Sequence, residues 1–168
     1  MTTEMRWPVT VSAAGLLIAT TMWAVPFAHA DNNRLNRSVV SNVYTVQRQA
    51  GCTNPLTVSP QLQLAAQWHT RDVLNNRVLQ GDIGSDGSTP QDRAAAAGFH
   101  GEVGETVAIN PALAMNNLEI IRQWYYDPAD YAVMSDCAYS LIGVWTENML
   151  DRTVVVAVYG DPSPPGAD

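Results

Sequence analysis

The sequence predicts an α+β domain in which helices cover a small antiparallel sheet, and two patterns support this. Helical patterns come first along the chain, whereas the strongest strand patterns come late, with one helix between strand-like segments. Segments 139–145 and 152–159 are rich in β-branched and aromatic residues and are separated by a polar turn, which predicts a hairpin. The length of 168 residues fits one domain with its own core.

Four helices are expected from apolar residues at helical spacing, together with start and stop signals. They cover 36–49, 60–75, 90–97 and 112–124. Asn110 and Pro111 are read as the start signal of the fourth helix, and Asp127 and Pro128 as its end. The buried positions expected in the fourth helix are Leu113, Leu118, Ile121 and Trp124. Segment 102–109 is expected to form a further strand of the sheet.

The first 30 residues resemble an export signal. Arg6 precedes an apolar run at 9–25, and small residues at 28 and 30 offer a cleavage site after Ala30. We therefore expect a signal peptide at 1–30, the domain at 31–160 and a disordered Pro-rich tail at 161–168. An uncut membrane anchor stays open as an alternative, because the apolar run is nearly as long as the roughly 20 residues that span a bilayer.

Charge and cysteine content restrict the possible partners. The net charge is −7, and all nine basic residues are scattered Arg, so no basic stripe is available for nucleic acid or for an anionic lipid surface. Cys52 and Cys137 are the two cysteines of a chain that is expected to enter an oxidising compartment. We expect them to form a disulfide, with two buried free thiols as the alternative.

Local motifs give no catalytic set. The loop at 84–88 contains Ser and Gly, but it lacks the spacing of an esterase nucleophile turn and the last ligand of a calcium hand. His69 and His100 are not at metal-ligand spacing, so a structural or surface role is expected for both. Several carboxylates instead fall in loops or near element ends, from which they could converge on a cleft: Asp82, Glu102, Glu105, Asp127 and Asp130.

An ordered series of motifs over about 35–160 resembles the bacterial branch of the CAP superfamily, which includes cysteine-rich secretory proteins, antigen 5 and plant pathogenesis-related proteins. The motifs are AQWHTRD at 66–72, GSDGSTP with DR at 84–93, GETVA at 104–108 and WYYDP at 124–128. The resemblance implies an α-β-α sandwich, an extracellular or cell-envelope setting and a cleft in which two His and two acidic residues can hold a divalent cation.

The chain departs from this family pattern in the cleft. By motif order, Asp82 and Asp130 stand where the two family His residues are expected. Glu105 matches the family Glu, although Thr106 replaces the Asn that follows it, and Asp127 matches the second acid. Oxygen-only ligands disfavour zinc and would suit calcium or magnesium at Asp82, Glu105 and Asp130. The alternatives are carboxyl groups that retain protons, or a cleft that binds no metal.

The leading functional hypothesis is a secreted or cell-envelope CAP-domain protein, monomeric and non-catalytic, that binds a lipid or an envelope protein. One alternative is an envelope hydrolase in which Glu105 is the general base and a protonated Asp82 or Asp130 is the general acid. Another is a structural interaction module held at the membrane by an uncleaved N-terminal segment.

Overall fold

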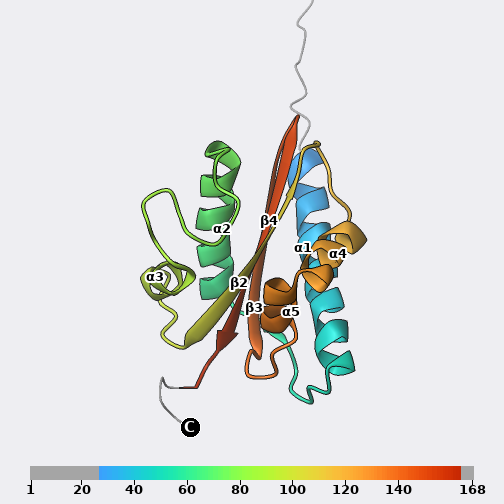
Figure 1. The fold of residues 1–168 in the computed structure, drawn as a ribbon, viewed down its shortest axis with the longest axis vertical. Helices are drawn as coiled ribbons and strands as arrows, with labels where there is room; N and C mark the ends of the chain where they lie inside the picture. The colour runs from blue at the N-terminus through green and yellow to red at the C-terminus, as the bar shows by residue number, and fades with distance from the viewer. Residues whose placement is uncertain (1–26, 164–168) are drawn as a thin grey trace, which may run out of the picture.

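The computed structural model describes the backbone of residues 27–163 and the side chains from Asn32 onward (Figure 1). Residues 1–26 of the predicted export signal and most of the predicted tail therefore lie outside the described residues, whereas residues 27–30 of that predicted signal belong to the first helix. The helices are α1 (Phe27–Gln49), α2 (Pro60–Asn75), α3 (Pro90–Ala96), α4 (Asn117–Tyr126) and α5 (Pro128–Met134). The strands are β1 (Thr57–Val58), β2 (Glu102–Asn110), β3 (Leu141–Met149) and β4 (Arg152–Asp161).

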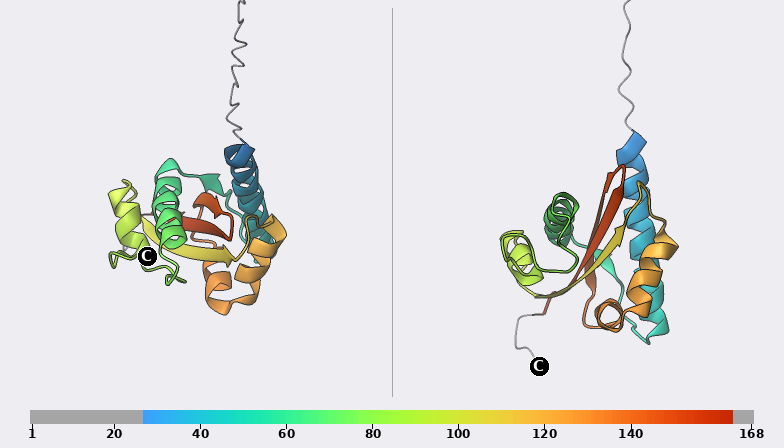
Figure 2. Two further views of the ribbon diagram at one scale, coloured as in Figure 1. Left: turned by 90° about the horizontal axis from the view of Figure 1, so that it is seen from above. Right: turned by 45° about the horizontal axis from the view of Figure 1, so that its top comes forward.

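The predicted α-β-α sandwich is confirmed. Figures 1 and 2 show the sheet between two helical layers, with α2 and α3 on one face and α1, α4 and α5 on the other. The strand order is β1-β3-β4-β2, and β3 and β4 form the predicted antiparallel hairpin. The sheet is mixed rather than wholly antiparallel, because the short strand β1 pairs in parallel with β3. A strand of two residues carries no alternation pattern, so the sequence could not reveal it.

Strand β4 is the centre of the core. It pairs with β2 on one side and with β3 on the other, and it is buried from Arg152 to Gly160. Successive side chains point to opposite faces of a strand, so Val155, Ala157 and Tyr159 pack on the α1 side, whereas the even-numbered valines pack with the buried residues of α2. One apolar run thus fills two separate core layers.

The start predicted for the fourth helix, at residue 112, is wrong. The backbone of Asn110 still belongs to β2, where it pairs with Thr153, and α4 begins only after the cap Asn116, whose side chain accepts from the amide of Glu119. Leu113 and Leu118, which were expected to be buried, are therefore 52% and 66% exposed. Trp124 is fully buried as expected, but Ile120 rather than Ile121 is the other fully buried position.

Two further helix predictions need correction at their ends. Helix α1 begins at Phe27, nine residues before the expected start at 36. Asp127 ends α4 but also caps α5, because its carboxylate accepts from the amides of Ala129 and Asp130. The Asp-Pro pair was interpreted only as a stop, although it is also a strong start signal. Helices α2 and α3 match their predictions closely.

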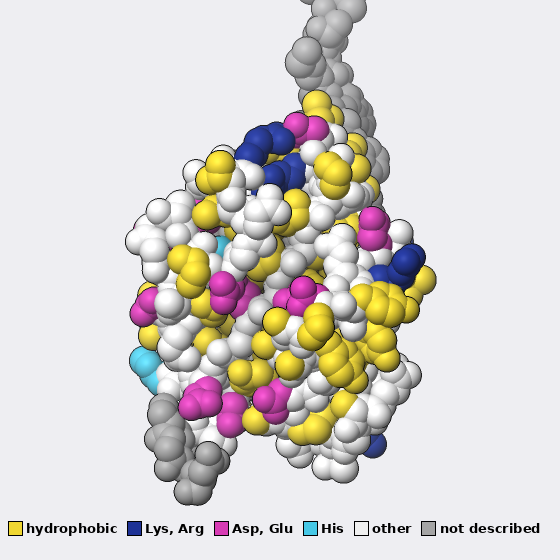
Figure 3. Space-filling view, in the orientation of Figure 1, with side chains coloured by type: hydrophobic (Ala, Val, Ile, Leu, Met, Phe, Trp, Pro, Cys, Tyr) yellow, Lys and Arg dark blue, Asp and Glu magenta, His cyan; other side chains and the backbone are white. Residues whose placement is uncertain are grey.

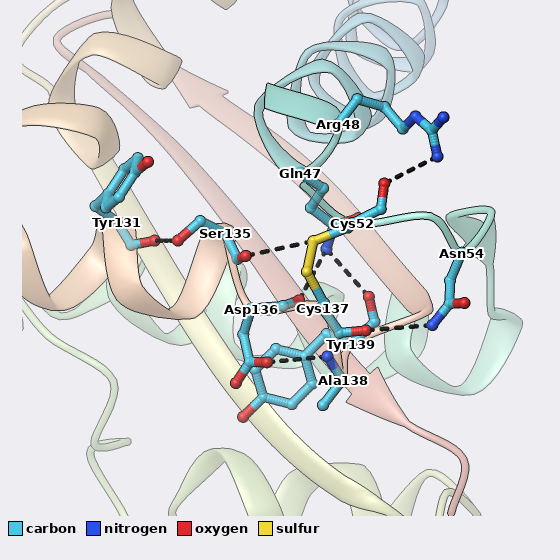
Figure 4. The surroundings of a disulfide bond; sticks show 10 residues. All are labelled: Gln47, Arg48, Cys52, Asn54, Tyr131, Ser135, Asp136, Cys137, Ala138 and Tyr139. Atoms are coloured by element: carbon cyan, nitrogen blue, oxygen red, sulfur yellow. Dashed lines mark hydrogen bonds between the residues drawn. A yellow bond between two sulfur atoms is a disulfide. The ribbon is translucent and has the colours of Figure 1, made fainter. Parts of the chain in front are cut away.

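The disulfide between Cys52 and Cys137 is confirmed, and Figure 4 shows its surroundings. It joins the segment after α1 to the turn between α5 and β3. The side-chain amide of Gln47 donates to the carbonyls of Asp136 and Tyr139, and Asn54 donates to that of Cys137. The bridge and these hydrogen bonds together fasten the end of α1 to the start of β3. Among the helices of the described part, none is long and apolar enough to cross a membrane.

Candidate functional site

A hollow of about 380 Å³ brings the four predicted cleft residues together. Asp82 comes from the loop after α2, Glu105 from β2, and Asp127 and Asp130 from the start of α5. Figure 3 shows acidic side chains near the middle of this face, with others toward its lower edge and sides. The remaining lining residues are Gln80, Gly81, Val107, Ala129 and Val133. The shared hollow is a structural finding, whereas a ligand for these residues stays a prediction.

The four carboxyl groups have different surroundings. Asp82 and Asp127 are exposed, Asp130 is half-buried, and the side chain of Glu105 is fully buried. Asp127 Oδ1 is occupied by two backbone amides of α5 at 2.9 and 3.2 Å. Glu105 Oε2 has no hydrogen-bond partner within the described residues. Glu105, which lines the hollow, therefore has one buried carboxyl oxygen without a hydrogen-bond partner among the described residues.

Arg93 is the functional residue that the sequence reasoning missed. Its Nη2 donates to Glu105 Oε1 at 2.9 Å and to the carbonyl of Asp82 at 2.7 Å, and its Nη1 donates to the carbonyl of Ser88 at 2.7 Å. The guanidinium thus ties α3, the loop after α2 and strand β2 together behind the hollow. The DR pair at 92–93 was noted as a family motif, but no role followed from its position alone.

His69, on helix α2, lies near the same carboxyl oxygen of Glu105 that Arg93 contacts. Its side chain is fully buried, and its Nε2 lies 2.9 Å from the carbonyl of Gly81 and 3.4 Å from Glu105 Oε1. Burial, followed by the nearby charge of Arg93, lowers the pKa of His69, so the ring is neutral at pH 7. Because a carbonyl only accepts, the contact with Gly81 assigns the proton to Nε2.

Two carboxyl groups of the hollow hold protons more tightly than usual. Burial raises the pKa of Glu105 to about 8, even though the Arg93 guanidinium lowers it. Burial raises the pKa of Asp130 to about 6, with further contributions from the charges of Asp127 and Asp82. At pH 7 Glu105 is therefore mostly protonated, and its unpartnered Oε2 can act as a donor.

The predicted calcium or magnesium site does not fit these residues. No group of three or more His, Cys, Asp or Glu in the described part of the chain is arranged to hold a metal ion. Oε1 of Glu105 is already occupied by Arg93, and Oδ1 of Asp127 by the amides of α5. The hollow gathers carboxyl groups, but it does not aim them at a common point.

The raised pKa of Glu105 makes a prediction for stability. A raised folded-state pKa stabilises the fold fully below the ordinary value near 4.5, and this contribution is lost as pH rises through about 8. Between pH 7 and 8.5, where His69 is mostly neutral in both states, the free energy of unfolding of the native protein should therefore fall. Glu105→Gln should flatten this decline in urea titrations. Glu102→Gln, an exposed change on the same strand, is the control, and an equal decline in both variants would contradict the assignment.

Comparison with protein families decides the classification. The family model described as the cysteine-rich secretory protein family, CAP, matches residues 41–159. The chain belongs to the CAP family. A search of curated protein sequences finds no match. The family assignment therefore rests on the domain model and is supported by the fold.

Solved structures of bacterial CAP proteins share this fold at low sequence identity. An outer surface protein of Borrelia burgdorferi has a TM-score of 0.68 and 14% identity, over 78% of this chain and 95% of that protein. An extracellular SCP-domain protein of Bacillus anthracis has a TM-score of 0.64 and 13% identity, over 83% of this chain and 45% of that protein. A cysteine-rich secretory protein of Staphylococcus aureus has a TM-score of 0.59 and 12% identity, over 81% of this chain and 40% of that protein. The chain thus spans less than half of the last two proteins. These relatives are surface or secreted proteins by description, and the disulfide of this CAP domain is consistent with an extracellular location.

Proposed function

We propose that this CAP domain is a secreted or cell-envelope binding protein, that it is not an enzyme, and that its acidic hollow holds a basic segment of an envelope protein. The observation that carries the proposal is the lining of the hollow. Four carboxyl groups face it, of which Glu105 is mostly protonated at pH 7, and no Arg among the described residues lines it. A ligand that brings positive charge gains from this arrangement, whereas an anionic one is repelled.

The lining of the hollow also bears on the two other hypotheses, lipid binding and catalysis. A lipid chain requires a mostly apolar wall, and here Val107, Ala129 and Val133 are the principal apolar contributors. Catalysis through a hydroxyl, thiol or amine nucleophile requires such a group in an activated form, and no Ser, Thr, Cys or Lys of the described chain lines the hollow. Both points favour the binding of a basic protein segment over lipid binding and over hydrolysis through a nucleophile of that kind.

The proposal is tested by titrating the full exported domain with a short Arg-rich peptide and following binding by calorimetry. We expect binding that weakens with salt, and a loss of about tenfold in affinity for the Asp82→Asn/Asp130→Asn double variant. Asp151→Asn removes a charge in the β3–β4 turn and serves as the matched control. Binding of fatty-acid micelles but not of the peptide, or equal peptide affinity in all variants, would contradict the proposal.

A hydrolase is the second candidate, and the pKa values of two carboxyl groups favour it. Between pH 6 and 8, Asp130 is ionised and can act as a base, whereas Glu105 is protonated and can act as an acid. These pKa values make Asp130 the base and Glu105 the acid, which is the reverse of the roles that the sequence suggested for them. Ester or peptide hydrolysis with pH limbs near 6 and 8, abolished by Glu105→Gln, would favour this candidate over simple binding.

A further inference from the structure

A second hollow, of about 460 Å³, lies between α2 and the segment that contains α3. Its lining residues are Trp68, His69, Asp72, Ser85, Asp86, Ser88, Asp92, Arg93 and Ala96. It shares no lining residue with the acidic hollow. The contacts of Glu105 with His69 and Arg93 form a partition between the two, because Glu105 faces one hollow while His69 and Arg93 face the other.

Three ionised carboxylates and an aromatic ring line this second hollow. Hydrogen bonds from Ser88 and Thr89 lower the pKa values of Asp86 and Asp92, respectively. Partial burial raises the pKa of Asp72, but hydrogen bonds from Ser85 and Asn76 lower it overall. Trp68 is 39% exposed, which leaves part of its ring accessible. An ionised carboxylate attracts cations, and the face of Trp does so as well.

The positive charge of Arg93 does not cancel these carboxylates. Its Nη1 and Nη2 donate to Glu105, to the carbonyl of Asp82 and to Ser88, so these donors are directed into the protein, whereas its Nε has no partner among the described residues. One guanidinium also stands against three carboxylates in the lining, which leaves the hollow negative.

His69 supplies an observation independent of the acidic residues. Its side chain is fully buried and its Nε2 proton is directed at the carbonyl of Gly81. Nδ1 therefore carries a lone pair, and it has no hydrogen-bond partner among the described residues. A buried acceptor without a donor is costly, and here it belongs to a residue that lines the hollow. A ligand with N–H donors would satisfy it.

We propose that this second hollow, which we call the Trp68 hollow, binds the primary ammonium group of an organic amine. The ammonium N–H groups donate to His69 Nδ1 and to the carboxylates, while the positive charge and the adjoining methylene groups lie against Trp68. The requirement for both donors and positive charge separates this ligand from a neutral alcohol, which lacks the charge, and from a quaternary ammonium, which lacks the N–H groups. No metal is needed, since the described residues form no metal cluster.

The test is an NMR titration of the full exported domain with n-butylammonium, with n-butanol and tetramethylammonium as comparison ligands. The indole N–H signal of Trp68 should shift with n-butylammonium and respond at least about tenfold more weakly to the other two. The backbone amide signals of Ser85 and Ser88, which line the same hollow, report binding in every variant, including those that lack the Trp68 indole. Followed by these signals, Trp68→Leu and Asp86→Asn should each weaken n-butylammonium binding by about fivefold to tenfold, whereas Trp68→Phe should retain most of the affinity. Asp151→Asn, in the β3–β4 turn, is the control for a change in net charge.

The variants should fold like the native protein, because the side chains of Trp68 and Asp86 are exposed. This is checked by comparing the NMR spectrum of each variant with that of the native protein away from the changed residue. Equal binding of n-butanol would show an apolar pocket and overturn the proposal. The proposal would also fail if the Trp68 signal did not move, or if Trp68→Leu bound n-butylammonium as tightly as the native protein.

Discussion

Replacing both Cys52 and Cys137 with Ala should lower the free energy of unfolding by about 4 to 5 kcal/mol. The two residues are 85 positions apart, so the bridge restricts a long loop of the unfolded chain. The bridge also holds the end of α1 against the turn before β3 (Figure 4). Urea titration monitored by circular dichroism measures the change. A loss of this size is a large fraction of the stability of a typical domain.

Reduction provides the control for this experiment. Dithiothreitol should destabilise the native protein by a similar amount and leave the double Ala variant unchanged. If reduction and the double replacement each changed the free energy of unfolding by less than about 1 kcal/mol, the bridge would not be a major source of stability.

Replacing Arg93 with Met should lower the free energy of unfolding by about 3 to 5 kcal/mol. Met fills much of the same volume, but it leaves Glu105 Oε1 and the carbonyls of Asp82 and Ser88 without the donors that Arg93 supplies. Buried acceptors that lose their partner are costly. The same urea titration measures the effect, and Arg93→Lys should recover only part of it because one ammonium cannot reproduce the fork of a guanidinium.

Two comparisons make the Arg93 prediction specific. Arg71→Met removes a largely exposed Arg whose partner is Glu147, and it should cost no more than about 1 kcal/mol. Combining Arg93→Met with Glu105→Gln should give a change that differs from the sum of the single changes by at least about 0.5 kcal/mol, because the two side chains are in contact. Additivity would mean that the contact contributes nothing.

Local signals explain which elements the sequence could predict. Ser59 followed by Pro60 starts α2, and Thr89 followed by Pro90 starts α3, because in both cases a side-chain oxygen caps the helix before a proline. Asn110 followed by Pro111 is likewise a capping residue before a proline, but it does not start a helix. The side chain of Asn110 donates to the carbonyl of Ala114 while its backbone remains in β2, and only tertiary pairing decides between these outcomes.

The sequence could predict only the part of the candidate site that local motifs carry. Motif order identified Asp82, Glu105, Asp127 and Asp130, and the structure brings these four around one hollow. The role of Arg93 depends on contacts with β2 and with the loop after α2, so no local pattern could reveal it. The Trp68 hollow likewise depends on how the loop at 84–88 folds against α2.

The central position of β4 has a consequence for the order of folding. β4 is the last strand of the described chain, yet both core layers pack on it and both β2 and β3 pair with it. A nascent chain that lacks residues 152–161 has the helices of both layers but not the strand between them. Pairing over long sequence separation is also slow. The core of the domain should therefore stay open until residues 152–161 are available, so that both of its layers form together in one late step.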